Sequence, residues 1–156
     1  MLTIFFVLSI IVISLDQWLK LWTVANLGIG ESQNVIEHFF SLNYVQNTGA
    51  AWSILEGETT FFTIITIVAV TVVIYLMIRY RNDSKFLNLG LALVLAGAVG
   101  NFIDRIRLGY VVDMIQVDFI QFPIFNIADC SLVIGVICIF IYTIFEDRLK
   151  GKNYVG

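Results

Sequence analysis

The sequence predicts an all-α membrane protein, with four transmembrane helices, a small extracytoplasmic β-sheet and a short interfacial helix. Of the 156 residues, 59% are hydrophobic and only 13% are charged, and the mean hydropathy is +0.90. A soluble domain is about half apolar and about a quarter charged, so this chain has too little polar surface to be one. We expect residues 1–156 to form a single membrane domain.

Four apolar stretches are long enough to cross a bilayer, which takes about 20 residues at a rise of ~1.5 Å per residue. They are the segments 2–24, 61–78, 86–103 and 127–145. The first has no basic region ahead of its apolar run and no A-x-A-like cleavage site after it. We therefore expect it to be a retained helix and not a cleaved signal peptide.

Lysine and arginine residues set the expected orientation, because cytoplasmic loops are enriched in them. Three lie in the connector 79–85 and three in the tail 148–152, whereas the segment 21–78 has none. The N-terminus, this connector and the C-terminus are therefore expected in the cytoplasm. The long loops 25–60 and 104–126 are expected outside.

Both outer loops contain patterns typical of ordered structure. Ser41–Val45 alternates as a half-buried strand does, and Leu108–Ile115 carries β-branched pairs that also predict a strand. The Asn-Thr-Gly-Ala-Ala run at 47–51 predicts a turn. Ala50–Leu55 predicts a short interfacial helix with Trp52 at headgroup depth.

Composition excludes several classes of site. One histidine and two cysteines are too few for a zinc cluster, which needs about four ligands. A net charge of -3 without a basic patch argues against a nucleic-acid partner. Cys130 and Cys138 lie roughly 12 Å apart along one predicted helix, too far for a disulfide. We expect no metal and no cofactor.

Charged residues inside a membrane are costly and usually have a role. Asp16 and Lys20 are four residues apart, so they share a helix face and can pair. Two interpretations remain open. The pair is a structural ion pair near the outer interface with Lys20 snorkelling, or Lys20 orients oxygen atoms of a substrate or lipid headgroup.

Small residues in the third span predict close helix packing. Ala96 and Gly100 form a small-xxx-small pair. Asn101 and Asp104 follow on the side of Gly100, where packing alone does not explain them unless they hydrogen-bond inside the bundle. Asp104 and Arg105 are expected to join an interfacial charge network.

Asp113 and Asp129 are the candidates for catalysis. Asp113 has hydrophobic neighbours on both sides, and Asp129 lies in the first turn of the fourth span, three residues after Asn126. The simple interpretations are a loop carboxylate and a helix N-terminal carboxylate with Asn126 as N-cap. If the two meet at the outer interface, their titrations couple, so one can accept a proton while the other donates one. Hydrolysis of a peptide by water needs these two roles.

Two other classes of protein compete with a protease as interpretations of these residues. A proton- or ion-coupled transporter subunit would use the intramembrane acids as a path, but the inner halves of the second and fourth spans carry no charge. A non-catalytic scaffold would need only the small-residue packing. The sequence contains neither H-E-x-x-H nor G-x-S-x-G, so it lacks these two hydrolase motifs.

Five short motifs follow one another in a specific order and spacing. They are Asp16-Gln17-x-x-Lys20, Asn47-x-Gly49-Ala50-Ala51, Gly97-x-x-Gly100-Asn101-x-x-Asp104-Arg105, Gly109-x-Val111-Val112-Asp113 and Phe125-Asn126-x-Ala128-Asp129. With them, nearly the whole chain resembles the lipoprotein signal peptidases (signal peptidase II), which are bacterial four-helix aspartyl proteases of the plasma membrane.

The resemblance implies a catalytic dyad of Asp113 and Asp129, and an outer β-cradle with an interfacial helix. It implies a diacylglyceryl-modified prolipoprotein as substrate, cut just before the lipidated cysteine, and we expect a monomer surrounded by membrane lipids. Met114 departs from the family, because many members have Phe there. The residues implied to support or line the substrate site are Asp16, Lys20, Asn47, Gly49, Ala50, Ala51, Gly97, Asn101, Asp104, Arg105 and Asn126.

Overall fold

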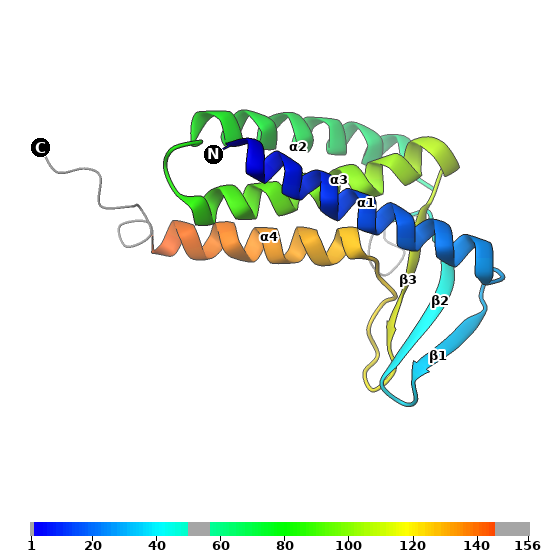
Figure 1. Ribbon diagram of the computed structural model, residues 1–156. Helices are drawn as coiled ribbons and strands as arrows, with labels where there is room; N and C mark the ends of the chain where they lie inside the picture. Colours follow the sequence, from blue (N-terminus) through cyan, green and yellow to red (C-terminus); the bar gives the residue numbers. More distant parts are fainter. Residues whose placement is uncertain (1, 50–56, 146–156) are drawn as a thin grey trace, which may run out of the picture.

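The computed structural model describes residues 2–49 and 57–145. In this part of the chain the elements follow in mixed order, with two strands before the second helix and one before the fourth (Figure 1). They are α1 (Leu2–Asn26), β1 (Ser32–Ile36), β2 (Phe40–Asn47), α2 (Thr59–Arg79), α3 (Lys85–Leu108), β3 (Val111–Val117) and α4 (Ile127–Ile144). All four helices are long and apolar enough to cross a membrane, as predicted.

The third helix is longer than predicted. We placed the start of the outer loop at residue 104, but α3 continues to Leu108. It ends because Gly109 takes up the left-handed conformation, with φ 80°, and donates its N–H to the carbonyl of Arg105. The strand predicted from Leu108 therefore begins only at Val111.

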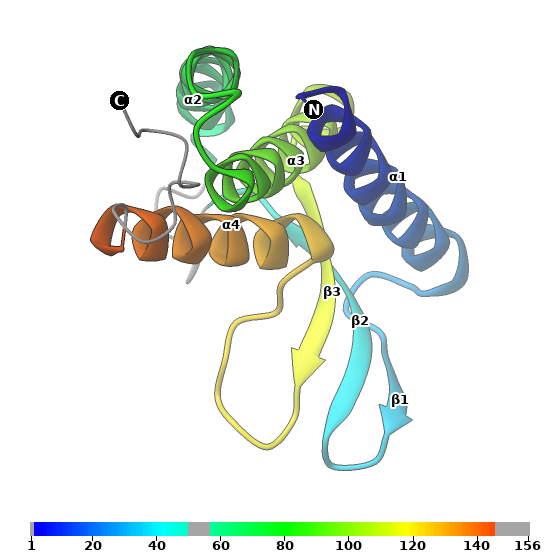
Figure 2. The same ribbon diagram turned by 60° about the vertical axis from the view of Figure 1, so that its left-hand side comes forward.

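Helix α3 forms the centre of the bundle and contacts α1, α2 and α4 (Figure 2). Its buried side chains, among them Leu91 and Leu95, pack in a core with Phe5 of α1 and Met77 of α2. Toward α4 the packing is closer, because a Cβ added to Gly90 would lie 2.9 Å from the carbonyl oxygen of Gly135.

Gly97 and Gly100 continue this approach toward the outer end of α3. A Cβ on Gly97 would meet the backbone of Ala128, and one on Gly100 would lie 2.8 Å from Asp16 Oδ2. The predicted small-residue packing is therefore present, and it brings α3 against the start of α4. Any larger side chain here would separate the two helices.

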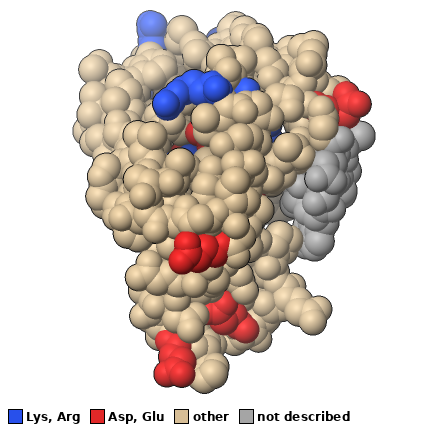
Figure 3. Space-filling view, turned by 90° about the vertical axis from the view of Figure 1, so that its right-hand side faces the viewer, with Lys and Arg blue, Asp and Glu red and all other residues tan. Residues whose placement is uncertain are grey.

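The three strands form one antiparallel sheet in the order β1-β2-β3, which projects from one end of the bundle (Figures 1 and 2). The predicted strand Ser41–Val45 lies within β2, whereas β1 was not predicted. Acidic side chains are scattered over the part of this end that the sheet forms, and most of its surface is uncharged (Figure 3). The predicted interfacial helix Ala50–Leu55, with Trp52, lies outside the described residues.

The pairing of β2 with β3 fixes the position of Asp113, one of the two candidate catalytic residues. Asp113 of β3 pairs with Val45 of β2, and an irregularity between Leu42 and Val45 changes the register there. On the other face, Met114 and Val112 pack in a small core with Tyr44 and Leu27. Met114 is fully buried in this core, beside the strand that carries Asp113.

Candidate active site

Asp113 is held in the sheet by two asparagine side chains. Its side chain is almost fully buried, with 2% of the residue exposed. Asn47, at the end of β2, donates its Nδ2–H to Asp113 Oδ2 over 2.8 Å, and Asn126 donates to Oδ1 over 2.6 Å. Both carboxyl oxygens therefore accept a hydrogen bond.

Asp129 is fixed by the N-terminus of α4. Asn126 is the N-cap and accepts the backbone N–H of Asp129 over 2.9 Å, while Asp129 Oδ2 accepts the backbone N–H of Asn126 over 3.2 Å. This reciprocal capping box confirms the predicted N-cap. Asn101 of α3 donates its Nδ2–H to Asp129 Oδ1 over 2.7 Å.

Asn126 joins the two carboxyl groups. It is completely buried, donates to one aspartate and caps the helix that begins with the other. Burial and the negative charge of Asp129 raise the pKa of Asp113 to about 7, against the hydrogen bonds from Asn47 and Asn126 and the charge of Lys20. Asp113 can therefore exchange a proton near neutral pH.

Both aspartates line one cavity of about 990 Å³. Its walls come from β2, β3, α2, α3, α4 and the connector 122–125, and most of the lining side chains are apolar. Arg105 also lines this cavity, with its guanidinium carbon 5.0 Å from the centre of the Phe62 ring. Its Nη2 donates to the carbonyl of Gly49 over 3.3 Å.

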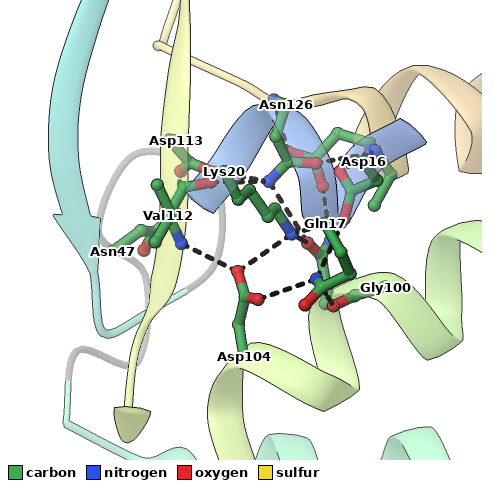
Figure 4. A network of polar contacts seen from close by, with 12 residues as sticks. Asp16, Gln17, Lys20, Asn47, Gly100, Asp104, Val112, Asp113 and Asn126 are labelled. Carbon is green, nitrogen blue, oxygen red and sulfur yellow. Dashed lines mark hydrogen bonds and ion pairs between the residues drawn. The ribbon is translucent and has the colours of Figure 1, made fainter. Parts of the chain in front are cut away.

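A second polar cluster, formed by Asp16, Gln17, Lys20 and Asp104, lies beside Asp113 and Asn126 (Figure 4) and does not line the cavity. Lys20 Nζ lies 2.9 Å from Asp16 Oδ2 and 2.9 Å from Asp104 Oδ2, and its side chain is only 3% exposed. The predicted Asp16–Lys20 pair is therefore confirmed, but the predicted snorkelling of Lys20 is wrong. Of the expected charge network, Asp104 forms an ion pair with Lys20, whereas Arg105 donates to the carbonyl of Gly49 and interacts electrostatically with the carboxyl groups of Asp129, Asp113 and Asp104.

Gln17 also belongs to this cluster, although the sequence analysis placed it in a motif and not among the predicted site residues. Its Nε2 donates to Asp104 Oδ1 over 2.9 Å and to the carbonyl of Gly100 over 3.2 Å. It thereby ties α1 to α3. The available signal was a polar side chain between Asp16 and Lys20 in an otherwise apolar span.

The site residues predicted from the sequence fall into two groups, those that line the cavity and those that do not. Those that line the cavity are Asn47, Gly49, Asn101, Arg105, Asp113 and Asp129. Those that do not line the cavity, but bond to other residues of the site or allow the helices to pack closely, are Asp16, Lys20, Gly97, Asp104 and Asn126. Ala50 and Ala51 lie outside the described residues.

The described ranges 2–49 and 57–145 contain no group of three or more His, Cys, Asp or Glu residues that could hold a metal ion. Cys130 and Cys138 are both free, as their spacing predicted. The polar side chains that line the cavity include the carboxyl groups of Asp113 and Asp129, the carboxamides of Asn47 and Asn101 and the guanidinium of Arg105.

The fold and this site define a multi-pass membrane protein with one buried and one half-buried carboxyl group joined through one asparagine. The family model for signal peptidase (SPase) II matches residues 8–145. The lipoprotein signal peptidase of Enterococcus faecalis is 53% identical over 155 residues, which cover 98% of this chain and 96% of that protein. That of Latilactobacillus sakei is 49% identical over 146 residues, covering 94% and 97%.

Solved structures agree with these relatives. A bacterial membrane enzyme solved by the in meso method at 2.3 Å resolution is 40% identical and superposes with a TM-score of 0.88, covering 99% of this chain and 95% of the other. The chain therefore belongs to the signal peptidase II family. It is a peptidase of the aspartic type, and the interpretation as an enzyme is confirmed.

Proposed function

We propose that this peptidase removes the signal peptide from diacylglyceryl-modified prolipoproteins, cutting just before the lipidated cysteine. Asp113 and Asp129 activate the attacking water. The observation that carries this proposal is that both carboxyl groups line one cavity and are joined by Asn126. The substrate class is supported by the relatives, which are lipoprotein signal peptidases.

Each of the two carboxyl groups carries out one of the two proton transfers in the proposed reaction. One, ionised, accepts a proton from the water as its oxygen attacks the scissile carbonyl carbon. The other, protonated, supplies a proton as the C–N bond breaks and the amine leaves. A pKa of about 7 for Asp113 supports this division, because the pair can then hold a single proton near neutral pH.

The cavity suits a substrate that is itself part of the membrane. Apolar side chains of α2, such as Phe62 and Ile65, and of α4, such as Leu132 and Val133, line it. A signal helix and acyl chains present the same chemistry, so they can occupy this space without exposing apolar surface to water. Arg105 and Asn47 then provide polar contacts near the scissile bond.

The direct test is cleavage by the purified chain in detergent. A precursor peptide with a diacylglyceryl-modified cysteine is expected to be cut before that cysteine, whereas the same peptide without the lipid is expected to be cut at least about 100-fold more slowly. Mass spectrometry of the products locates the cut. Equal cleavage of both peptides, or cleavage of neither, would contradict the proposed function.

We also propose that the enzyme lies in the bacterial plasma membrane with its termini in the cytoplasm and its active site toward the outer face. The connector between α2 and α3, with its basic residues, lies at the end of the bundle opposite the sheet (Figure 1). This separation supports the orientation expected from the basic residues.

Cysteine labelling in intact cells tests this orientation. After both native cysteines are replaced, Glu37→Cys on the sheet, where the side chain is 82% exposed, is expected to react with a membrane-impermeant maleimide. Arg81→Cys in the exposed connector is expected to react only after the cells are opened. The reverse pattern would place the active site on the cytoplasmic side.

A further inference from the structure

Three asparagines donate to the two aspartates, and each must present its nitrogen and not its oxygen. For Asn47 and Asn126 the backbone decides this. Asn47 Oδ1 accepts the N–H of Gly49 over 2.9 Å, and Asn126 Oδ1 accepts the N–H of Asp129 over 2.9 Å. Because a backbone N–H can only donate, the oxygen of each carboxamide must face it, and the nitrogen faces the carboxylate.

For Asn101 the side chain of Lys20, and not a backbone N–H, determines which way the carboxamide faces. Asn101 Oδ1 accepts from Lys20 Nζ over 3.0 Å, and its Nδ2 donates to Asp129 Oδ1 over 2.7 Å. Its oxygen also accepts from Asn126 Nδ2 over 3.2 Å. An ammonium group has no acceptor, so it excludes the opposite orientation of this carboxamide.

Lys20 is itself held in place from several elements. Asp16 of its own helix and Asp104 of α3 bind its ammonium group. Asp16 Oδ1 also accepts the N–H of Ala128 over 2.9 Å, and Asp104 Oδ2 accepts the N–H of Val112 over 3.0 Å. Figure 4 shows Lys20 between Asp104 and the strand that carries Asp113. The ammonium group therefore has a fixed position.

We propose that Lys20 is a positioning residue of the active site: its ammonium group fixes the Asn101 carboxamide so that the amide N–H faces Asp129. This inference rests on the proposed function, because Asp129 matters only if it takes part in cleavage. Without Lys20 the Asn101 oxygen keeps only the longer bond from Asn126 Nδ2, which Asn126 shares with Asp113, so the carboxamide can more easily rotate and place its oxygen against the carboxylate oxygen. That contact is repulsive, so the ionised carboxylate loses its support.

A double-mutant cycle tests whether Lys20 acts through Asn101. Lys20→Met and Asn101→Ala are each expected to lower kcat/KM by about 10-fold or more, and the double variant is expected to match Asn101→Ala within about twofold. The matched control pairs Lys20→Met with Asn47→Ala, whose effects should multiply because Gly49 orients Asn47. Effects of Lys20 and Asn101 that multiply in full would overturn the proposal.

The pH dependence supplies a readout that packing alone would not move. The charged groups near Asp113 are Asp129, Lys20 and Arg105, and Lys20 faces Asp16 and Asp104. Removing the positive charge disfavours the carboxylate form, so the acid limb of the kcat/KM profile should move up by about one pH unit in Lys20→Met. The same substitution at the exposed Lys85 should leave the profile unchanged.

Infrared titration of the protonated carboxyl band, assigned through its loss in Asp113→Asn, follows the same shift without substrate. If the wild-type chain cuts no lipopeptide, the proposed function fails, and a midpoint that still rises in Lys20→Met shows only that the charge of Lys20 supports the carboxylate form of Asp113. If the wild-type chain cuts but the midpoint does not move, the inference fails alone.

Lys20→Met leaves two buried carboxylates without their cation, so a second variant protects the test against misfolding. Lys20→Met/Asp16→Asn restores the net charge of the cluster, and the new asparagine keeps an oxygen for the N–H of Ala128. The cycle is repeated in this background with the same expectation. If both variants lose the thermal unfolding transition of the wild type, Lys20 is a structural residue and the proposal is overturned.

Discussion

Replacing either cavity aspartate by asparagine, in Asp113→Asn or Asp129→Asn, is expected to lower cleavage of a lipidated precursor by about 10⁴-fold or more. The proposed mechanism needs one carboxyl group that accepts a proton and one that donates it. A carboxamide of the same size can do neither. The measurement is kcat/KM of the purified variants with a lipopeptide.

The fold should survive these substitutions, because a buried carboxyl group is exchanged for an isosteric neutral one. Burial already disfavours the charge of Asp113, as its raised pKa shows, and removing that charge offsets part of the cost of turning one amide N–H toward Asn47 or Asn126, so Asp113→Asn should keep a cooperative unfolding transition. Asp118→Asn is the matched control, since Asp118 follows the same strand but binds Ser41 outside the cavity. Wild-type activity in either cavity variant would refute the proposed dyad.

The helices could be predicted well because their apolar runs are long and their caps are local. Ser84 caps α3 and Asn126 caps α4, each through bonds to residues two or three positions away. The predicted end of α3 is too early, because charged residues such as those after residue 103 usually mark the end of a membrane span. Asp104 is instead neutralised inside the bundle by Lys20, so the helix continues to Leu108.

Strand β1 could not be predicted from its own residues. The segment Ser32–Ile36 is exposed along its whole length and has no alternation of polar and apolar side chains. It is a strand because its backbone pairs with the edge of β2, with Ser32 opposite Asn43 and Gln33 opposite Leu42. Only tertiary pairing contains that information.

The residues of the site could be predicted from the sequence, but not which of them line the cavity and which lie outside it. The topology predicted from the sequence placed Asp113 and Asp129 at the same membrane interface, and the family resemblance implied that they form a pair. Lys20 was placed near the membrane interface because single-helix spacing shows only its neighbour Asp16. The contacts that bury it, with Asp104 and Asn101, come from another helix and lie more than 80 residues away in the chain.

Asn126 is expected to serve activity and stability through different atoms, which two substitutions can separate. Asn126→Ser keeps an oxygen for the N–H of Asp129 but removes the Nδ2–H that donates to Asp113, whereas Asn126→Ala removes both. Both variants should lose about 100-fold or more in kcat/KM, because Asp113 loses one of its two hydrogen-bond donors. Only Asn126→Ala should also lose about 1 kcal/mol of unfolding free energy, the usual contribution of an N-cap.

Loss of the Asn126 Nδ2–H donor also determines the direction in which the pKa of Asp113 changes. The hydrogen bond from Asn126 lowers the pKa of Asp113, so both variants should raise this pKa above its value of about 7 and recover part of their activity at higher pH. Ser84→Ala provides the control, because it removes the N-cap of α3, whose hydroxyl accepts the N–H groups of Phe86 and Leu87. It should lower the unfolding temperature as Asn126→Ala does, but leave kcat/KM and its pH profile unchanged. If Asn126→Ser instead kept wild-type activity, the amide donor to Asp113 would have no role in cleavage, and Asn126 would serve only as a helix cap.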